Sequence, residues 1–115
     1  MSVANGVLYV ADNLAGALLR IGDSGAEPVA EGLDQPEGLA AANGSIYVVE
    51  AGAGRVVEID PASGESTTVT EGLELQVPPS GAFPNTMLFN GIATDGETAW
   101  VAGDAANTVY VIDLD

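Results

Sequence analysis

Apolar residues recur in short runs along the chain, and each run ends in small or acidic residues. Three such runs, over residues 7–12, 46–50 and 99–103, are rich in valine, isoleucine and aromatic side chains. A turn of Gly, Ala and Asn residues follows each run, and a second run lies beyond the turn. The second runs cover residues 17–21, 55–60 and 108–113. Short runs of β-forming residues separated by turn residues predict strands joined as hairpins.

The paired runs are copies of one unit. When Tyr9, Tyr47 and Trp100 are aligned, an isoleucine lies twelve residues after each of them without a gap. The first two aromatic residues are 38 positions apart and the last two are 53 apart. The excess of 15 residues indicates an insertion between the second and third units, at about residues 73–88.

The middle unit predicts four antiparallel strands. An alanine-rich segment at residues 38–42 precedes the two apolar strands, and a polar Thr/Val segment at residues 66–71 follows them. Pro28 falls in the first unit's equivalent of the polar strand, and proline belongs at a sheet edge because it has no amide N–H to donate. Four strands in roughly 40 residues, graded from apolar to polar, are typical of a β-propeller blade.

The sequence resembles NHL-type blades and the related six-bladed propellers of the SMP-30/gluconolactonase family. The matching segments are QPEGLA, YVVEAGAGRVVEIDPASGE, FNGIATDG and WVAGDAANTVYVID. The resemblance implies an all-β fold of about three four-stranded antiparallel blades, half of a six-bladed ring. Blade 1 would cover residues 1–33, blade 2 residues 34–72, the insertion loop residues 73–88 and blade 3 residues 89–115. Propellers of this kind host hydrolases, lyases, binding proteins and interaction platforms, so the resemblance concerns fold more than activity.

The repeat alignment predicts an open arc. It places Met1 within the innermost strand of the first blade, and it leaves the last blade without its outermost strand. An arc of three blades has two faces without a neighbour. We therefore expect either a homo-oligomer, a dimer that completes a six-bladed ring, or the remainder of a longer propeller chain.

The charge of the chain excludes several functions. Two cationic residues stand against 17 acidic ones, for a net charge of -15, so the surface would repel nucleic acids and anionic membranes. Histidine and cysteine are absent, which excludes Ser-His and Cys-His catalysis and zinc chemistry within the chain. The remaining oxygen donors suit Ca²⁺. Such acidity is typical both of proteins adapted to high salt and of calcium-rich extracellular settings, so it does not identify a compartment.

Glu37 and Asn90 are the candidate metal ligands. Each precedes a glycine at the predicted start of an innermost strand, beside the channel of a propeller. The resemblance implies metal ligands of this kind, because SMP-30-like proteins use a Glu, an Asn and an Asp, each before Gly. Glu37 matches the first and Asn90 the second, and no third match is present. The alternative is a tight turn in which glycine permits close packing.

The other charged residues are expected to be structural. Asp12, Glu50 and Asp104 lie where a strand turns, and we expect solvated turn carboxylates there. Arg20 and Arg55 occupy different places in their repeats and are expected to form exposed ion pairs.

Two functions fit this sequence. The first is a non-catalytic propeller module or fragment that assembles with another copy or chain and binds a ligand at the channel mouth. The second is a Ca²⁺-dependent, SMP-30-like lactonase or hydrolase formed on ring completion, in which Glu37 would act as a metal ligand or as a base. The first is favoured for the isolated chain, because two innermost strands supply too few converging ligands for hydrolysis.

Overall fold

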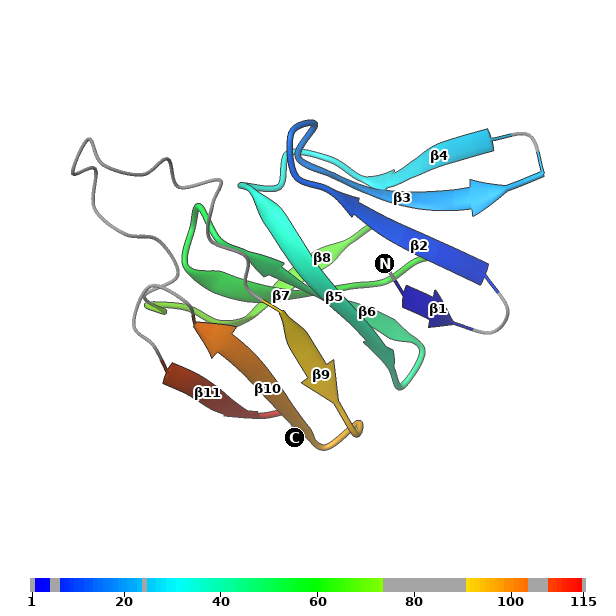
Figure 1. The fold of residues 1–115 in the computed structure, drawn as a ribbon. Helices are drawn as coiled ribbons and strands as arrows, with labels where there is room; N and C mark the ends of the chain where they lie inside the picture. Colours follow the sequence, from blue (N-terminus) through cyan, green and yellow to red (C-terminus); the bar gives the residue numbers. More distant parts are fainter. Residues whose placement is uncertain (1, 5–6, 24, 74–90, 104–107, 115) are drawn as a thin grey trace, which may run out of the picture.

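The chain folds into three antiparallel β-sheets that follow one another along the sequence (Figure 1). The structure is a computed structural model that describes residues 2–4, 7–23, 25–73, 91–103 and 108–114. No helix that could span a bilayer occurs in these residues. Most of the predicted insertion, residues 74–88, lies outside them.

Each sheet is a meander in which every strand pairs with the next. The first sheet contains β1 (Ser2–Ala4), β2 (Val7–Asp12), β3 (Ala17–Gly22) and β4 (Gly25–Ala30). The second contains β5 (Pro36–Ala42), β6 (Ser45–Glu50), β7 (Arg55–Ile59) and β8 (Ser66–Thr70). The third contains β9 (Ile92–Thr94), β10 (Thr98–Gly103) and β11 (Thr108–Asp113). The predicted all-β, antiparallel fold is confirmed.

The strand register repeats from sheet to sheet. Each of the three aligned aromatic residues lies opposite the residue eleven positions later on the next strand. The pairs are Tyr9 with Arg20, Tyr47 with Glu58 and Trp100 with Val111. The sequence repeat is therefore also a structural repeat. Pro28 lies in β4, an edge strand, as its missing N–H predicts.

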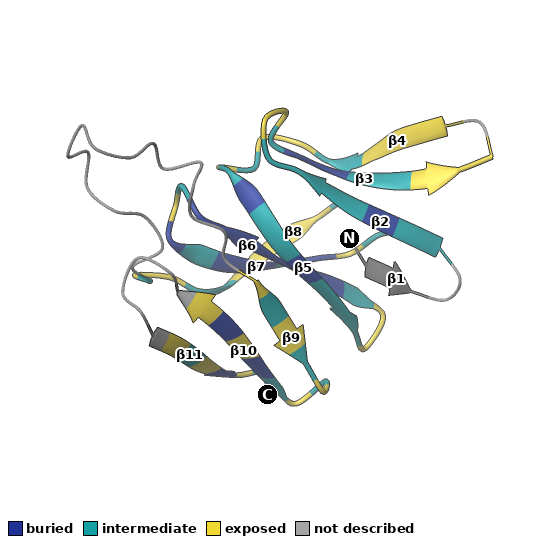
Figure 2. Ribbon diagram, in the orientation of Figure 1, coloured by how far each residue is buried: buried dark blue, intermediate teal, exposed yellow. Residues whose placement is uncertain are grey.

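The core lies between the sheets, and the middle sheet is buried on both faces (Figure 2). Successive residues of a strand point to opposite faces, so Ile46 and Val48 of β6 face the first sheet while Tyr47 and Val49 face the third. The buried side chains between the first and second sheets form one cluster. It consists of Tyr9, Leu18, Leu39, Ile46, Val48, Val57 and Ile59. The cluster toward the third sheet is Tyr47, Val49, Ala51, Val56, Ala99, Val101 and Ile112.

The first strands of the three sheets lie side by side. β5 lies against β1 and β2 on one side and against β9 on the other. The outer strands β4 and β8 are largely exposed, as the yellow segments in Figure 2 show. Solvent exposure rises from the inner to the outer strands, as the residues along each unit change from small and apolar to polar.

In each of the first two units, one glycine is hydrogen-bonded to the chain segment that leaves the unit. The carbonyl oxygen of Gly16 accepts a hydrogen bond from the Leu33 N–H, and that of Gly54 accepts one from the Leu73 N–H, both at 2.9 Å. Both glycines have positive φ, +66° and +64°, and a Cβ at either would lie 2.5 Å from the leucine carbonyl oxygen. Only glycine permits this close approach of two backbone segments.

Replacing Gly54 with alanine should destabilise the fold more than replacing Gly44 with alanine. Both positions have positive φ, which costs an L-residue roughly 1–2 kcal/mol. At Gly44 the new methyl group would meet nothing within 4 Å, whereas at Gly54 it would meet the carbonyl oxygen of Leu73. Urea unfolding of the two variants at equal protein concentration measures the difference. Equal losses would contradict the close approach.

Candidate functional site

Glu37 lies in a β-bulge at the start of β5. Pro36 is opposite Glu50 and Leu39 is opposite Val48, so Glu37 and Gly38 together face the single residue Val49 of β6. A bulge of this kind re-aims a side chain and is common beside functional sites. The Glu37 side chain is half-buried. The sequence offered a tight turn as the alternative role of Glu37 and Gly38. In the structure these two residues form a bulge within the strand.

The second candidate ligand, Asn90, lies outside the residues that the structure describes. Its neighbour Gly91 is described, and the Gly91 carbonyl oxygen accepts a hydrogen bond from the Ala102 N–H at 3.0 Å. Glu37 belongs to β5, and Asn90 precedes β9 in the sequence. These two strands lie against each other. Across the described part of the chain, no three acidic side chains gather closely enough to hold a metal ion.

The start of β5 is held from both sides. The side-chain amide of Asn13, in the turn between β2 and β3, donates to the Pro36 carbonyl oxygen at 3.3 Å. The N–H of Ala51 donates to the Gln35 carbonyl at 3.0 Å, and the N–H of Gly52 donates to the Asp34 carbonyl at 3.1 Å. The first sheet and the turn after β6 therefore fix the backbone that leads into the bulge.

Glu50 is a buried carboxylate, so the expectation of a solvated turn residue is wrong. Its side chain is fully buried at the end of β6. One carboxylate oxygen accepts the Asp34 N–H at 2.9 Å, and the other accepts the Nε–H of Arg55. The segment before β5 folds over Glu50 and excludes water, which the local sequence around position 50 does not reveal. A buried carboxylate is tolerated only when it is paired and hydrogen-bonded.

Arg55 has a different role from the exposed ion-pair partner that was expected. Its side chain is 36% exposed, but its carboxylate partner is fully buried. The hydrogen bond that Arg55 donates to Glu50 raises the pKa of Arg55 above its ordinary value, so this guanidinium stays charged. The pair joins β6, β7 and the segment that leads to Glu37.

The remaining expectations for charged residues are met where they can be examined. A side-chain oxygen of Asp12 accepts the Ala15 N–H at 3.1 Å, which is a turn-stabilising bond. Arg20 pairs with Glu27 at 3.1 Å, and both side chains are exposed. Asp104 lies outside the described residues.

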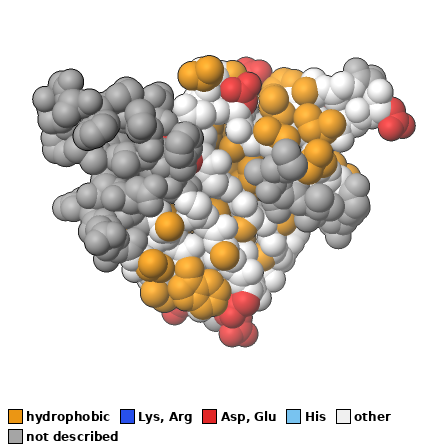
Figure 3. Space-filling model, viewed as in Figure 1, with side chains coloured by type: hydrophobic (Ala, Val, Ile, Leu, Met, Phe, Trp, Pro, Cys, Tyr) orange, Lys and Arg blue, Asp and Glu red, His pale blue; other side chains and the backbone are white. Residues whose placement is uncertain are grey.

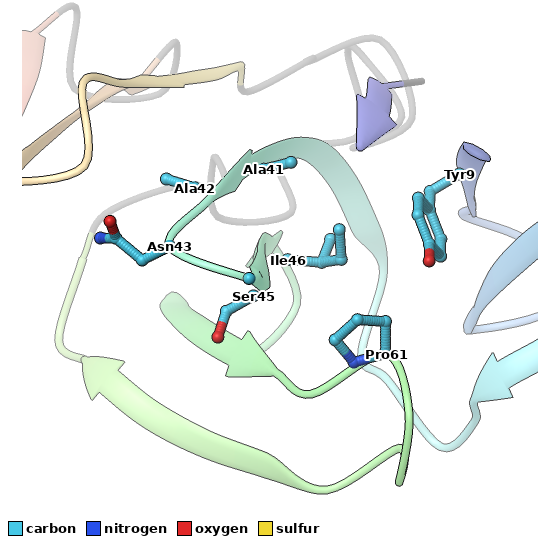
Figure 4. Close-up of a pocket in the computed structure, with 8 residues that line it drawn as sticks. Tyr9, Ala41, Ala42, Asn43, Ser45, Ile46 and Pro61 are labelled. Atoms are coloured by element: carbon cyan, nitrogen blue, oxygen red, sulfur yellow. The ribbon is translucent and has the colours of Figure 1, made fainter. Parts of the chain in front are cut away.

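A pocket of about 240 Å³ lies at the opposite end of β5 (Figure 4). It is lined by Tyr9, Ala41, Ala42, Asn43, Gly44, Ser45, Ile46 and Pro61. Tyr9 of the first sheet faces Ile46 and Pro61 of the second unit across this space. Sequence reasoning missed the pocket, because it forms between an aromatic side chain of one unit and the hairpin turn of the next.

Polar contacts fix one side of this pocket. The Ser45 hydroxyl donates to Glu58 at 2.7 Å, and the Asn43 side-chain amide donates to the Gly96 carbonyl at 2.7 Å. The neighbouring Tyr47 is buried in the core. Burial, followed by the charge of Glu58, raises the pKa of the Tyr47 phenol. The Asn-Gly pair at positions 43–44 is the sequence signal that could have identified this end of the sheet.

Comparison with known proteins supports the fold alone. No protein-family model and no curated protein matches the sequence. One similar solved structure is a structural genomics protein of unknown function from Bacteroides thetaiotaomicron VPI-5482, with a TM-score of 0.71 and 18% sequence identity. The match covers 96% of this chain and 33% of that one, so the chain spans about a third of the length of its structural neighbour.

Replacing Glu50 with glutamine should destabilise the protein by about 1–3 kcal/mol, because a buried charge-assisted bond to Arg55 is lost. The matched control is Glu27→Gln, which makes the same change in the exposed pair with Arg20 and should have little effect. Urea unfolding at equal protein concentration measures both. A loss for the Glu27 variant as large as that for the Glu50 variant would contradict the structural role assigned to Glu50.

Stability should fall above pH 10.0, the ordinary pKa of tyrosine, partly because of Tyr47. The Tyr47 phenol has a raised pKa in the folded state, so the unfolded chain loses this proton first and unfolding becomes more favourable as pH rises. In the Tyr47→Phe variant this contribution is absent, and the decline with pH should be shallower. Urea unfolding at a series of alkaline pH values compares the two slopes. Identical slopes would rule out a buried phenol at this position.

Proposed function

We propose that the chain is a three-bladed segment of a β-propeller of the NHL or SMP-30/gluconolactonase type, half of a six-bladed ring. In this proposal it is a non-catalytic module that assembles with another chain or copy and binds a ligand at the channel mouth. One observation carries the proposal: three successive sheets share one register and pack face to face, with their first strands side by side. That is the arrangement expected of adjacent propeller blades around a channel.

The use of the acidic side chains supports a module without catalysis. Glu50 is committed to Arg55 and to a backbone amide. Asp12 stabilises its own turn, and Asp95 accepts the N–H groups of Glu97 and Thr98, which lowers the pKa of Asp95. These three carboxylates stabilise turns and strand connections, so they are not available for acid–base chemistry at a shared site.

The proposed ligand site lies at Glu37 and Asn90. The bulge favours Glu37, because it sets a carboxylate at the start of an innermost strand on a backbone held from both sides. Calcium prefers six to eight oxygen ligands, and one described carboxylate falls short of that number. A complete calcium site would need oxygens from Asn90 and from a second chain. The alternative function, a Ca²⁺-dependent lactonase, requires such a complete site.

Glu37→Gln should weaken Ca²⁺ binding at least about tenfold, because calcium favours charged carboxylate ligands. The matched control is Glu31→Gln, which removes one charge from an exposed loop and should leave the affinity nearly unchanged. Calorimetric titration with CaCl₂, against NaCl at matched ionic strength, separates a specific site from screening of the net charge. Equal effects of the two substitutions would show that Glu37 is not a ligand.

A lactone-hydrolysis assay distinguishes the two functions. The non-catalytic module should show no hydrolysis above the background rate, with or without Ca²⁺. Hydrolysis that saturates with Ca²⁺ and disappears in the Glu37→Gln variant would contradict the module and favour the lactonase.

A further inference from the structure

The third sheet exposes an apolar face. Trp100 is 40% exposed, Val109 61% and Val111 69%, and all three point to the same side of the sheet because Trp100 pairs with Val111. With Ala93 and Ala102 they form a surface that we name the Trp100 face. Figure 3 shows hydrophobic side chains gathered over this region of the molecule, at the lower left. Four of these residues also border a shallow apolar hollow beside Gly91 and Ile92.

Two of these positions, those of Trp100 and Val109, are buried in the other two sheets. Trp100 corresponds to Tyr47 and Tyr9, which are 4% and 5% exposed. Val109, opposite Ala102, corresponds to Val56, opposite Val49, and Val56 is fully buried. In each of the first two sheets this face is covered by the next sheet. The Trp100 face therefore lacks the neighbour that its equivalents have.

The third sheet is also more apolar here than its equivalents. Val111 occupies the place of Arg20 in the first sheet and of Glu58 in the second. A charged side chain at the edge of a covered face can reach solvent, whereas an exposed valine gains from burial. The substitution favours a covered state of this face.

The first sheet carries the complementary face. Inside the chain, the surface that covers Tyr9 and Leu18 is formed by Ile46, Val48, Val57 and Ile59. The equivalent positions in the first sheet are Leu8, Val10, Leu19 and Ile21, which we name the Leu8 face. Leu8 pairs with Ile21 and Val10 with Leu19, so all four point to one side. Ile21 is 37% exposed although its equivalent, Ile59, is fully buried.

We propose that a second copy of this chain covers both surfaces, with the Trp100 face of each copy packed on the Leu8 face of the other. The inference rests on the proposed function, because it extends the packing of successive blades across a two-fold axis. At both internal interfaces, the face that carries the tyrosine of one sheet packs on the opposite, aliphatic face of the next sheet. The same pairing of unlike faces between two copies gives head-to-tail contacts. Two such contacts close a ring, and closure stops further growth.

A second copy is the occupant that the chain itself specifies. One chain carries a face and its complement, and faces of the same two kinds already pack together between its own sheets. The residues that define the two faces are all apolar, and Asp12 and Asp113 lie at strand ends on these same two sides. Two chains of charge -15 also repel each other at long range, so added salt should strengthen the association.

The test compares exposed substitutions on the two faces. Val109→Gln on the Trp100 face and Ile21→Gln on the Leu8 face should each raise the dimer dissociation constant at least about tenfold, because each removes apolar burial from both contacts. Leu14 is 92% exposed in the turn between β2 and β3 and belongs to neither face, so Leu14→Gln is the matched control. Sedimentation velocity across micromolar concentrations would detect the wild-type dimer as twice the 11.5 kDa chain mass.

Single cysteines distinguish the geometry, because the chain has none of its own. The equivalents of Val109 and Ile21 share one core cluster at each internal interface, so head-to-tail contact should bring position 109 of one copy close to position 21 of the other. A mixture of Val109→Cys and Ile21→Cys should therefore cross-link into a dimer while neither variant alone does. Contact between like faces predicts cross-linking of each variant alone.

The remaining outcomes separate the inference from the proposed function. A wild-type monomer, a dimer unaffected by both glutamine variants, or cross-linking of each cysteine variant alone would overturn the head-to-tail dimer and leave the propeller proposal standing. Small-angle X-ray scattering of the dimer tests that proposal separately, because a six-bladed ring has a central channel. A dimer that depends on both faces but has no ring-shaped profile would contradict the propeller and not the pairing of the faces.

Discussion

The fold depends on one constraint: a sheet with apolar residues on both faces must have a neighbour on each side. The middle sheet meets it, because Ile46 and Val48 are covered by the first sheet while Tyr47 and Val49 are covered by the third. Full burial of one such side chain contributes about 1.5–3 kcal/mol, so the two clusters dominate the stability of the chain. The first and third sheets obey the same alternation but have one covered face each. Repeat proteins share this property, since no unit can bury its surfaces alone.

One group of polar contacts lies where the chain passes from the first sheet to the second. Glu50 receives the Asp34 amide from the connecting segment and the Arg55 guanidinium from the adjacent strand. Burying a carboxylate is unfavourable, and these two partners offset that cost. The result is a rigid start to β5, in which the bulge at Glu37 is held from its own sheet and from the preceding one. A candidate ligand is therefore placed by contacts that also fix the packing of the sheets.

The strands could be predicted because they follow from local pattern. The expected run at residues 7–12 is β2, and the run at 55–60 is β7 with its last residue outside the strand. Pro28 could be placed on an edge because its missing N–H is a property of one residue. Glu50 could not be placed, because its burial depends on residues 34–35, in the segment before β5, folding over it. The bulge at Glu37 and the pocket beside Tyr9 were missed for the same reason, since both are defined by register between segments. The role of Asn90 as a metal ligand stays a prediction.

The proposed dimer and the proposed calcium site depend on each other. One chain offers Glu37 and Asn90, and a second copy related by a two-fold axis would add the same pair across the channel, which approaches the six to eight oxygens that calcium prefers. Calcium would then bind the ring more tightly than the single chain. A ligand that prefers the assembled state stabilises it, and the coupling is reciprocal. At constant ionic strength, the dimer dissociation constant should therefore fall as Ca²⁺ is added in wild type but not in Glu37→Gln. A rise in NaCl should strengthen both dimers to a similar extent, because screening acts on the net charge and not on the site.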